Sequence, residues 1–179
     1  MKLIRQALTL IVVMMVNTAC GGAAADHEAL GDQAYVERRF SEALAEFQLE
    51  LRQGATSGDL RRKAGMAALN ARELVEAAVQ FEALATEDED QLTLAADGLE
   101  RVARAASAEG NGPALQAALL GLRRVVPGRA LGTLAVELAV GLGENSSPAE
   151  AIGVLPFAAG AAPDAGLQDS LMYAYGIAL

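Results

Sequence analysis

Hydrophobic positions along most of the chain recur at the three- and four-residue spacing of an α-helix. One such stripe runs through Leu92, Ala95, Leu99, Val102 and Ala106. Alternating apolar and polar runs, which would predict strands, are lacking. The pattern therefore predicts an all-α fold.

Two more stripes follow the first, and breaker residues separate them. A Gly-Asn-Gly-Pro cluster at 110–113 lies before the second stripe, and its proline can begin a helix because the missing N–H costs nothing there. Ser147-Pro148-Ala149-Glu150 is a capping box that predicts another helix start. The two stripes are Leu115, Leu119, Leu122 and Val126, and Leu131, Leu134, Leu138 and Leu142.

The first half of the chain repeats itself at an offset of 34 residues. Glycine and phenylalanine carry the signal, because the chain has only 18 Gly and 4 Phe. At the same offset, Phe40 corresponds in the sequence to the apolar Leu74. The matched pairs are Gly31 and Gly65, Ala34 and Ala68, Arg38 and Arg72, Glu42 and Glu76, Ala43 and Ala77, and Phe47 and Phe81.

This period and residue order resemble the tetratricopeptide repeat (TPR). The resemblance implies antiparallel helical hairpins stacked into a right-handed superhelical solenoid, with about four hairpins over 27–163. The Trp of the repeat is absent, and His27 stands in its place. The third hairpin fits only with a loop about four residues longer than the norm. The residues expected to pack the hairpins are Gly31, Phe40, Ala43, Phe47, Gly65, Leu74, Ala77 and Phe81.

Residues 164–179 end in an apolar, uncharged stretch that predicts a terminal unpaired helix, a repeat that stops before its second helix. Terminal repeats normally need a polar outer face. Three explanations stay open: the chain is truncated, a partner buries this helix, or a second copy does. Truncation would make the chain the accessory repeat region of a larger protein.

The N-terminus has the three parts of an export signal: Lys2 and Arg5, an apolar run from Ala7 to Val16, and small residues before Cys20. Thr18-Ala19-Cys20 resembles a bacterial lipobox, although Asn17 stands where an aliphatic residue is usual. The resemblance implies a signal peptide over 1–19, acylation of Cys20, and a tether over 20–26 that holds the domain at the membrane. Two alternatives are an ordinary cleaved signal and an uncleaved anchor.

Composition and charge narrow the range of functions. The formal net charge is −9, and nucleic acid binding needs a basic surface instead. The hydrophobic fraction is 53% with only 4% aromatic residues, and the abundant Ala and Leu favour helices. We therefore expect no nucleic acid partner and a helical protein. The lipobox resemblance implies that the protein is exported and lipid-anchored at the outer membrane, facing the periplasm.

Candidate chemistry is sparse. His27 is the only histidine and stands beside the tether, so we expect no Ser-His-Asp set. No second His or Cys has the spacing of a metal ligand. Gly110-Asn-Gly112 lacks the third glycine and the preceding strand of a dinucleotide loop. The acidic run 87–90 fits a helix start, with Thr86 and Glu89 as a capping box, better than a calcium loop. We expect no enzyme, no metal and no cofactor.

The TPR resemblance also implies a binding groove along the first helix of each hairpin. Glu28 and Asp32 stand where clamping repeats carry Lys and Asn, so binding of a partner's C-terminal carboxylate is not expected. The groove should be acidic at its first end and apolar in the middle, suited to an amphipathic or basic segment of another envelope protein. An ordinary solvated helix face is the alternative. The groove positions are Glu28, Asp32 and Tyr35, then Arg62, Met66 and Leu69, then Ala96, Glu100 and Ala103.

Overall fold

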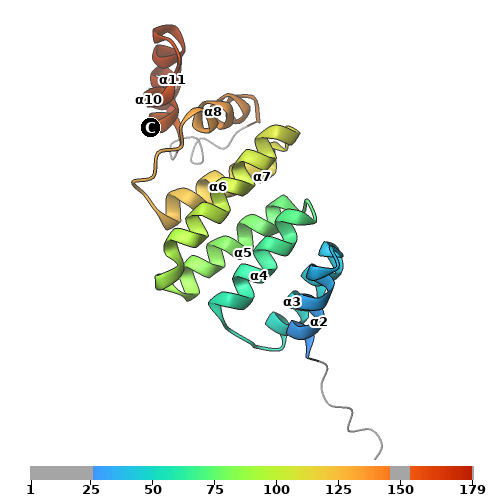
Figure 1. The fold of residues 1–179 in the computed structure, drawn as a ribbon. Coiled ribbons are helices and arrows are strands. Elements are labelled where there is room, and N and C mark those ends of the chain that lie inside the picture. Colours follow the sequence, from blue (N-terminus) through green and yellow to red (C-terminus); the bar gives the residue numbers. More distant parts are fainter. Residues whose placement is uncertain (1–25, 146–153, 179) are drawn as a thin grey trace, which may run out of the picture.

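The computed structural model describes residues 26–145 and 154–178, and in these ranges the chain is helical with no strand (Figure 1). The predicted all-α class is confirmed. In chain order the helices are α2 (His27–Val36), α3 (Phe40–Arg52), α4 (Gly58–Asn70), α5 (Leu74–Glu87), the short 3-10 helix η1 (Glu89–Gln91), α6 (Leu92–Glu109), α7 (Gly112–Val125), α8 (Thr133–Asn145), α10 (Leu155–Ala161) and α11 (Ala165–Ala178).

Consecutive helices pack as antiparallel pairs, α2 with α3, α4 with α5, and α6 with α7. In the first pair, the rings of Tyr35 and Phe40 meet edge to face beside the turn, with centroids 5.2 Å apart. At the far end His27 Nδ1 lies 2.6 Å from Glu46 Oε2. Contacts at both ends of the pair show that the two helices run in opposite directions along their length.

The same backbone turn joins the helices of all three pairs. Arg38 and Arg72 have positive φ angles of 62° and 66°, and Gly110 has 65°. The residue after each of these donates its N–H to a carbonyl five residues earlier, the bond that closes a Schellman motif. The three bonds are Arg39 N to Ala34 O at 2.9 Å, Glu73 N to Ala68 O at 2.9 Å, and Asn111 N to Ala106 O at 2.8 Å.

Glycines allow the phenylalanine rings to lie directly against a neighbouring helix. A Cβ added to Gly31 would lie 2.5 Å from Phe47 Cε1, and one added to Gly65 would lie 3.0 Å from Phe81 Cε1. Phe81 also faces Gly98 of α6, where an added Cβ would overlap the ring. Both rings are fully buried. Only hydrogen at these three positions permits this spacing.

The residues expected to pack the hairpins lie mostly inside the molecule. Phe40 is the exception, since it is half-buried against Tyr35. The buried members of the set are Gly31, Ala43, Phe47, Gly65, Leu74, Ala77 and Phe81.

The third pair departs from the expected loop, and the cap expected before it is wrong. The loop between the two helices of this pair is not longer than in the other pairs. Instead the first helix is longer: α6 has 18 residues where α4 has 13, and the turn after α6 stays short.

The predicted capping box of Thr86 and Glu89 does not form, because Thr86 lies inside α5, where its hydroxyl donates to Glu82 O at 3.1 Å. Asp88 caps the following turn instead, accepting from Asp90 N at 3.1 Å. Asn111 caps α7 in a comparable way, accepting from Ala114 N at 3.2 Å. The cap before η1 is thus two residues later than predicted.

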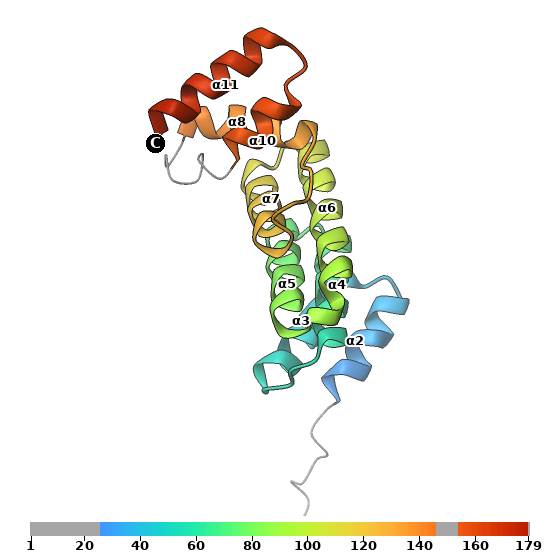
Figure 2. The same ribbon diagram turned by 90° about the vertical axis from the view of Figure 1, so that its left-hand side faces the viewer.

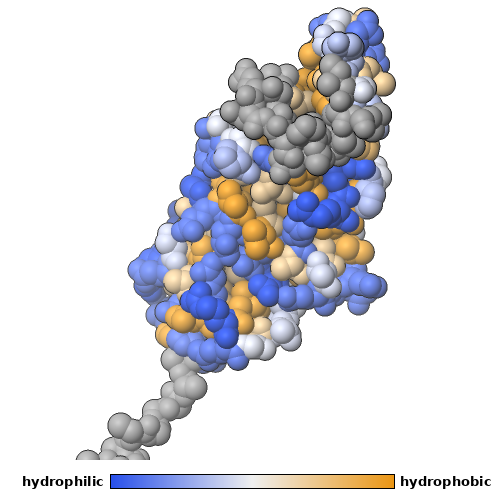
Figure 3. Space-filling view, turned by 180° about the vertical axis from the view of Figure 1, so that it is seen from behind, coloured by the Kyte–Doolittle hydropathy of each residue, from blue (hydrophilic) through white to orange (hydrophobic). Residues whose placement is uncertain are grey.

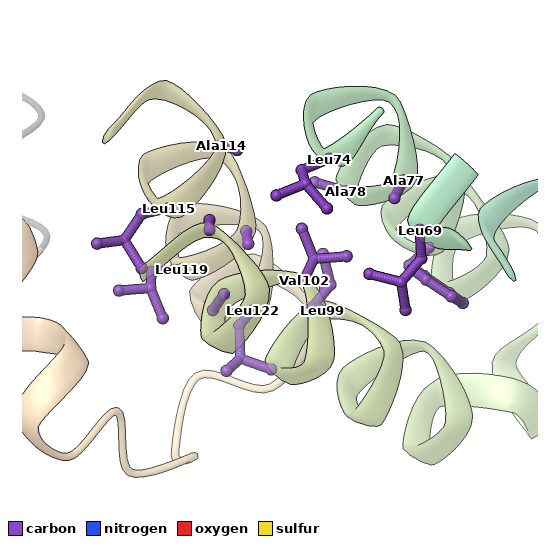
Figure 4. Close-up of a cluster of buried hydrophobic side chains, with 14 of the residues drawn as sticks. Leu69, Leu74, Ala77, Ala78, Leu99, Val102, Ala114, Leu115, Leu119 and Leu122 are labelled. Carbon is purple, nitrogen blue, oxygen red and sulfur yellow. The ribbon is translucent and has the colours of Figure 1, made fainter. Parts of the chain in front are cut away.

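The pairs lie in two layers with the core between them. Figure 2 shows α2, α4 and α6 on one side and α3, α5 and α7 on the other. In the close-up of Figure 4, Leu69, Leu74, Leu99 and Val102 converge from α4, α5 and α6. These side chains are at most 7% exposed, so each pair shares its buried surface with the next.

The C-terminal helices continue the molecule beyond α7. Arg123 of α7 stacks over the Phe157 ring of α10 at 3.6 Å. The expectation of an unpaired terminal helix needs a correction, because α11 packs against α10 and buries Leu171. In the described ranges no helix is long and apolar enough to cross a membrane. The predicted signal peptide, Cys20 and the capping box at Ser147–Glu150 lie outside the described residues.

Candidate functional site: a trough along α4 and α6

The first end of the predicted groove carries a lysine between its two carboxylates. Lys63 Nζ of α4 lies 2.6 Å from Glu28 Oε1 and 2.7 Å from Asp32 Oδ2 of α2. Asp59 lies 3.6 Å from the same nitrogen. Glu28 and Asp32 are therefore engaged by a cation of the chain itself, which corrects the expectation of an openly acidic end.

These contacts change the acidity of Lys63. Partial burial alone would lower the pKa of its ammonium group, but the hydrogen bonds and charges of Asp32 and Glu28 outweigh that effect. The pKa is raised well above the usual 10.5. Lys63 stays charged at neutral pH and joins α2 to α4.

The middle of the groove is held by a chain of polar contacts. Asn70 Nδ2 donates to Tyr35 Oη at 2.9 Å and to Met66 O at 2.8 Å. Met66 is half-buried, and its sulfur accepts from Arg101 Nη1 of α6 at 3.3 Å. Leu69 is buried at 7% exposure, so it forms the floor and not an open surface. Tyr35, Met66 and Arg101 thus mark a line across α2, α4 and α6.

Arg62 forms an ion pair within its own helix, α4, where its Nη2 lies 2.5 Å from Asp59 Oδ1. The bond and the charge of Arg62 lower the pKa of the Asp59 carboxyl, although burial opposes this. Arg62 therefore presents a neutralised ion pair to the groove.

On α6 the predicted positions are wrong for two residues. Ala96 and Ala103 are fully buried. Glu100 is half-buried and bonded to Arg129 Nε at 2.7 Å. The glycine facing Phe81 is Gly98, one residue before the position that the 34-residue offset gives, and one residue turns a helix by about 100°. The position of Gly98 in the sequence could have indicated that the faces of α6 are shifted by one residue.

Four exposed residues of α6 line hollows in the surface: Leu94, Asp97, Arg101 and Arg104. The sequence prediction missed them. The three hollows measure about 410, 360 and 400 Å³. Arg101 lines the first two and Arg104 the last two, so neighbouring hollows share a wall, and the three together are called the trough. The trough is lined by Arg62, Met66, Leu69 and Asn70 of α4, by Arg72 and Phe81, by Leu94, Asp97, Gly98, Glu100, Arg101, Arg104 and Ala105 of α6, by Leu119 and Leu122 of α7, and by Ala130, Leu131, Gly132, Thr133 and Leu134.

The arginines of the trough differ in their partners. Arg72 pairs with Glu109, and Arg104 Nη2 lies 3.2 Å from Glu100 Oε2. Arg101 is exposed and contacts Met66 sulfur, with no carboxylate within 4.0 Å in the described part of the chain. Arg101 is thus a cation that the chain itself does not neutralise by direct contact.

The carboxylates near Arg101 already form ion pairs with another arginine. Asp97 Oδ1 and Glu100 Oε1 accept from Arg129 at 2.9 and 2.7 Å. These bonds raise the pKa of the Arg129 guanidinium, with Glu100 the larger contributor. The carboxylates at the rim of the trough therefore face Arg129 and leave Arg101 open.

Within residues 26–145 and 154–178 no group of three or more His, Cys, Asp or Glu side chains is placed to hold a metal ion. His27 is bonded to Glu46 between α2 and α3 and lies outside the trough.

Comparisons of the chain with protein-family models, curated proteins and solved structures gave no match. The family and the function therefore stay predictions from the residues and the geometry.

Proposed function

We propose that the chain is a TPR-like, right-handed helical scaffold that binds a segment of another protein in the trough and carries out no catalysis. The trough itself carries the proposal, because its adjoining hollows are lined by the first helices of successive pairs, α4 and α6. The repeated turns at Arg38, Arg72 and Gly110 support a repeat architecture. Stacked pairs bury a shared core and leave one layer free for a partner.

The proposed setting is the bacterial envelope, with the chain exported and held by a lipid on Cys20 at the outer membrane, facing the periplasm. Labelling of growing cells with a palmitate analogue should mark the wild-type chain. Cys20→Ser should carry no label. A labelled Cys20→Ser protein would contradict the anchor and leave the trough untouched.

The binding function is tested by photo-crosslinking in cells. A photoreactive residue at Met66, in the trough, should give a discrete crosslinked adduct that mass spectrometry can identify. Val79 of α5 is 51% exposed and lines none of the three hollows, so the same residue there is the matched control. Equal adducts from both positions, or none from Met66, would contradict a binding role for the trough.

Self-association through 164–179 is the second candidate function. Met172 and Tyr173 of α11 are 50% and 73% exposed, so two large side chains of this helix are open to a partner copy. On the face seen in Figure 3, by comparison, hydrophobic side chains lie in small patches among hydrophilic ones. Sedimentation velocity over a concentration series distinguishes the two: a dimer that Met172→Ser and Tyr173→Ser abolish supports self-association.

A further inference from the structure

Arg101 lies between the first two hollows of the trough and lines both. It lines the hollow with Met66, Leu94 and Phe81, and also the hollow with Asn70 and Arg104. Its only hydrogen-bond partner in the described residues is the sulfur of Met66, a weak acceptor. A guanidinium is best satisfied by a carboxylate, which accepts two parallel bonds.

The surroundings of Arg101 favour an anion. The second hollow is lined by Arg72, Arg101 and Arg104 with Asn70, and by no carboxylate. Arg72 and Arg104 pair with Glu109 and Glu100 outside that lining, so Arg101 is the arginine of this hollow that has no carboxylate partner among the described residues. A negative group placed there meets a favourable potential, and a positive one meets repulsion.

The neighbouring hollow supplies an apolar contact. Met66 and Leu94 line this hollow together with Arg101. Asp97 lines it too, but its carboxylate already accepts from Arg129 Nη2 at 2.9 Å. Leu94 is 38% exposed, so an apolar partner side chain would remove its surface from water. An apolar and a cationic contact lie next to each other on one helix.

We infer that the trough binds an internal acidic segment of the partner, in which an Asp or Glu side chain faces Arg101 and an adjacent apolar side chain rests on Met66 and Leu94. This rests on the proposed scaffold function and reverses the charge expected from Glu28 and Asp32. The anion is assigned to an internal position of the segment because hollows adjoin Arg101 on two sides. A chain can therefore continue on both sides of it.

Selection from a displayed random-peptide library tests the inference on the full-length chain in mild detergent. The peptides are presented with flanking chain on both sides, so no free C-terminus is available. Binders that Met66→Ala weakens should be enriched in Asp or Glu beside a large apolar residue. Enrichment of Lys or Arg, or of no charge, overturns the inference.

Variants of both partners then test the contact with Arg101. Measured by fluorescence anisotropy on a selected peptide, Arg101→Gln should weaken binding about tenfold, and replacing the peptide's acidic residue by its amide should have a similar effect. Arg101→Glu should bind a Lys-substituted peptide better than wild type does. Rising salt should weaken the wild-type complex.

Arg52 of α3 is the control, because it is exposed, has no ion pair among the described contacts and lies outside the trough. Arg52→Gln should leave affinity unchanged. Equal losses for Arg52→Gln and Arg101→Gln, or none for Arg101→Gln, overturn the inference. The scaffold proposal fails separately, if a photoreactive residue at Met66 captures nothing in cells.

Discussion

Gly98 shows how one missing methyl group sets the distance between neighbouring helix pairs. The Phe81 ring lies between Gly65 and Gly98, and it is fully buried, so it has no free space to move into. Gly98→Ala should therefore destabilise the protein by about 1–3 kcal/mol, despite the better helix propensity of Ala. Urea denaturation followed by circular dichroism measures this.

Two variants make the result specific to the ring. Gly176 of α11 has no atom within 4 Å of an added Cβ, so Gly176→Ala should gain about 0.5–1 kcal/mol instead. In a Phe81→Leu background the penalty of Gly98→Ala should shrink, because the two changes are coupled. Full additivity of the two changes would refute the contact.

Lys63 joins α2 to α4, and its contribution should depend on pH in a defined direction. Lys63→Met removes the pairs with Glu28 and Asp32 and should cost about 1 kcal/mol at neutral pH, since both carboxylates are largely exposed. Because folding raises the pKa of Lys63, the stabilisation is complete below the pKa of the unfolded chain, about 10.4. It is lost as the pH rises through the folded pKa.

The measurement is the difference in unfolding free energy between wild type and Lys63→Met, taken from about pH 8 to pH 11. The difference should fall at the alkaline end. Arg62→Gln is the comparison, because Arg62 pairs with Asp59 inside α4 alone. A difference that grows with pH would mean that Lys63 is not stabilised in its charged form.

At the scale of elements, the three turns share their hydrogen bonds but not their residue type. Arg38 holds a left-handed conformation that only glycine adopts without strain, and Gly110 occupies the matching place in the third turn. Arg38→Gly should therefore stabilise the protein by about 0.5–1 kcal/mol. Gly110→Ala should cost about as much. Thermal unfolding compares the two, and a loss on Arg38→Gly would show that its side chain supports the turn.

The sequence predicted these elements where a pattern had a direct physical cause. The spacing of Leu92, Leu99 and Val102 gave a helix, and the offset between Gly31 and Gly65 gave two matching pairs with their rings in place. The length of α6 was not predicted from the sequence, because a comparison at a fixed offset of 34 residues cannot show that one helix is longer by more than a turn. The exposed face of α6 also differs from the prediction by one residue, because Gly98 faces Phe81 in place of the residue at the 34-residue offset.

At the scale of the whole molecule, the binding surface was harder to predict than the core. Burial follows local spacing, so Phe47 and Phe81 could be assigned from the chain alone. The charge of the trough depends on which side chains meet across helices, as Lys63 does with Asp32 and Arg129 with Glu100. Partners some 30 residues apart leave no periodic signal. The sequence therefore predicted an acidic groove, although arginines line the middle of the trough.

The distribution of buried side chains predicts where the molecule opens first. Of the largest fully buried residues, only Val154 lies beyond α7, and the others belong to α3–α7. Most of α11 is exposed apart from Leu171. In a stack where each pair contacts its neighbours, the ends have one neighbour fewer and open at lower free energy.

Hydrogen exchange read by mass spectrometry should therefore show the slowest amides in α4–α6, faster ones in α2, and the fastest in α11. Gly98→Ala should accelerate exchange on both sides of Phe81, in α4, α5 and α6 together, because the ring belongs to two pairs. Exchange that rises in α6 alone would mean that the pairs open independently. Arg101→Gln serves as the control, because it changes an exposed contact of α6 and should leave the whole pattern as in wild type.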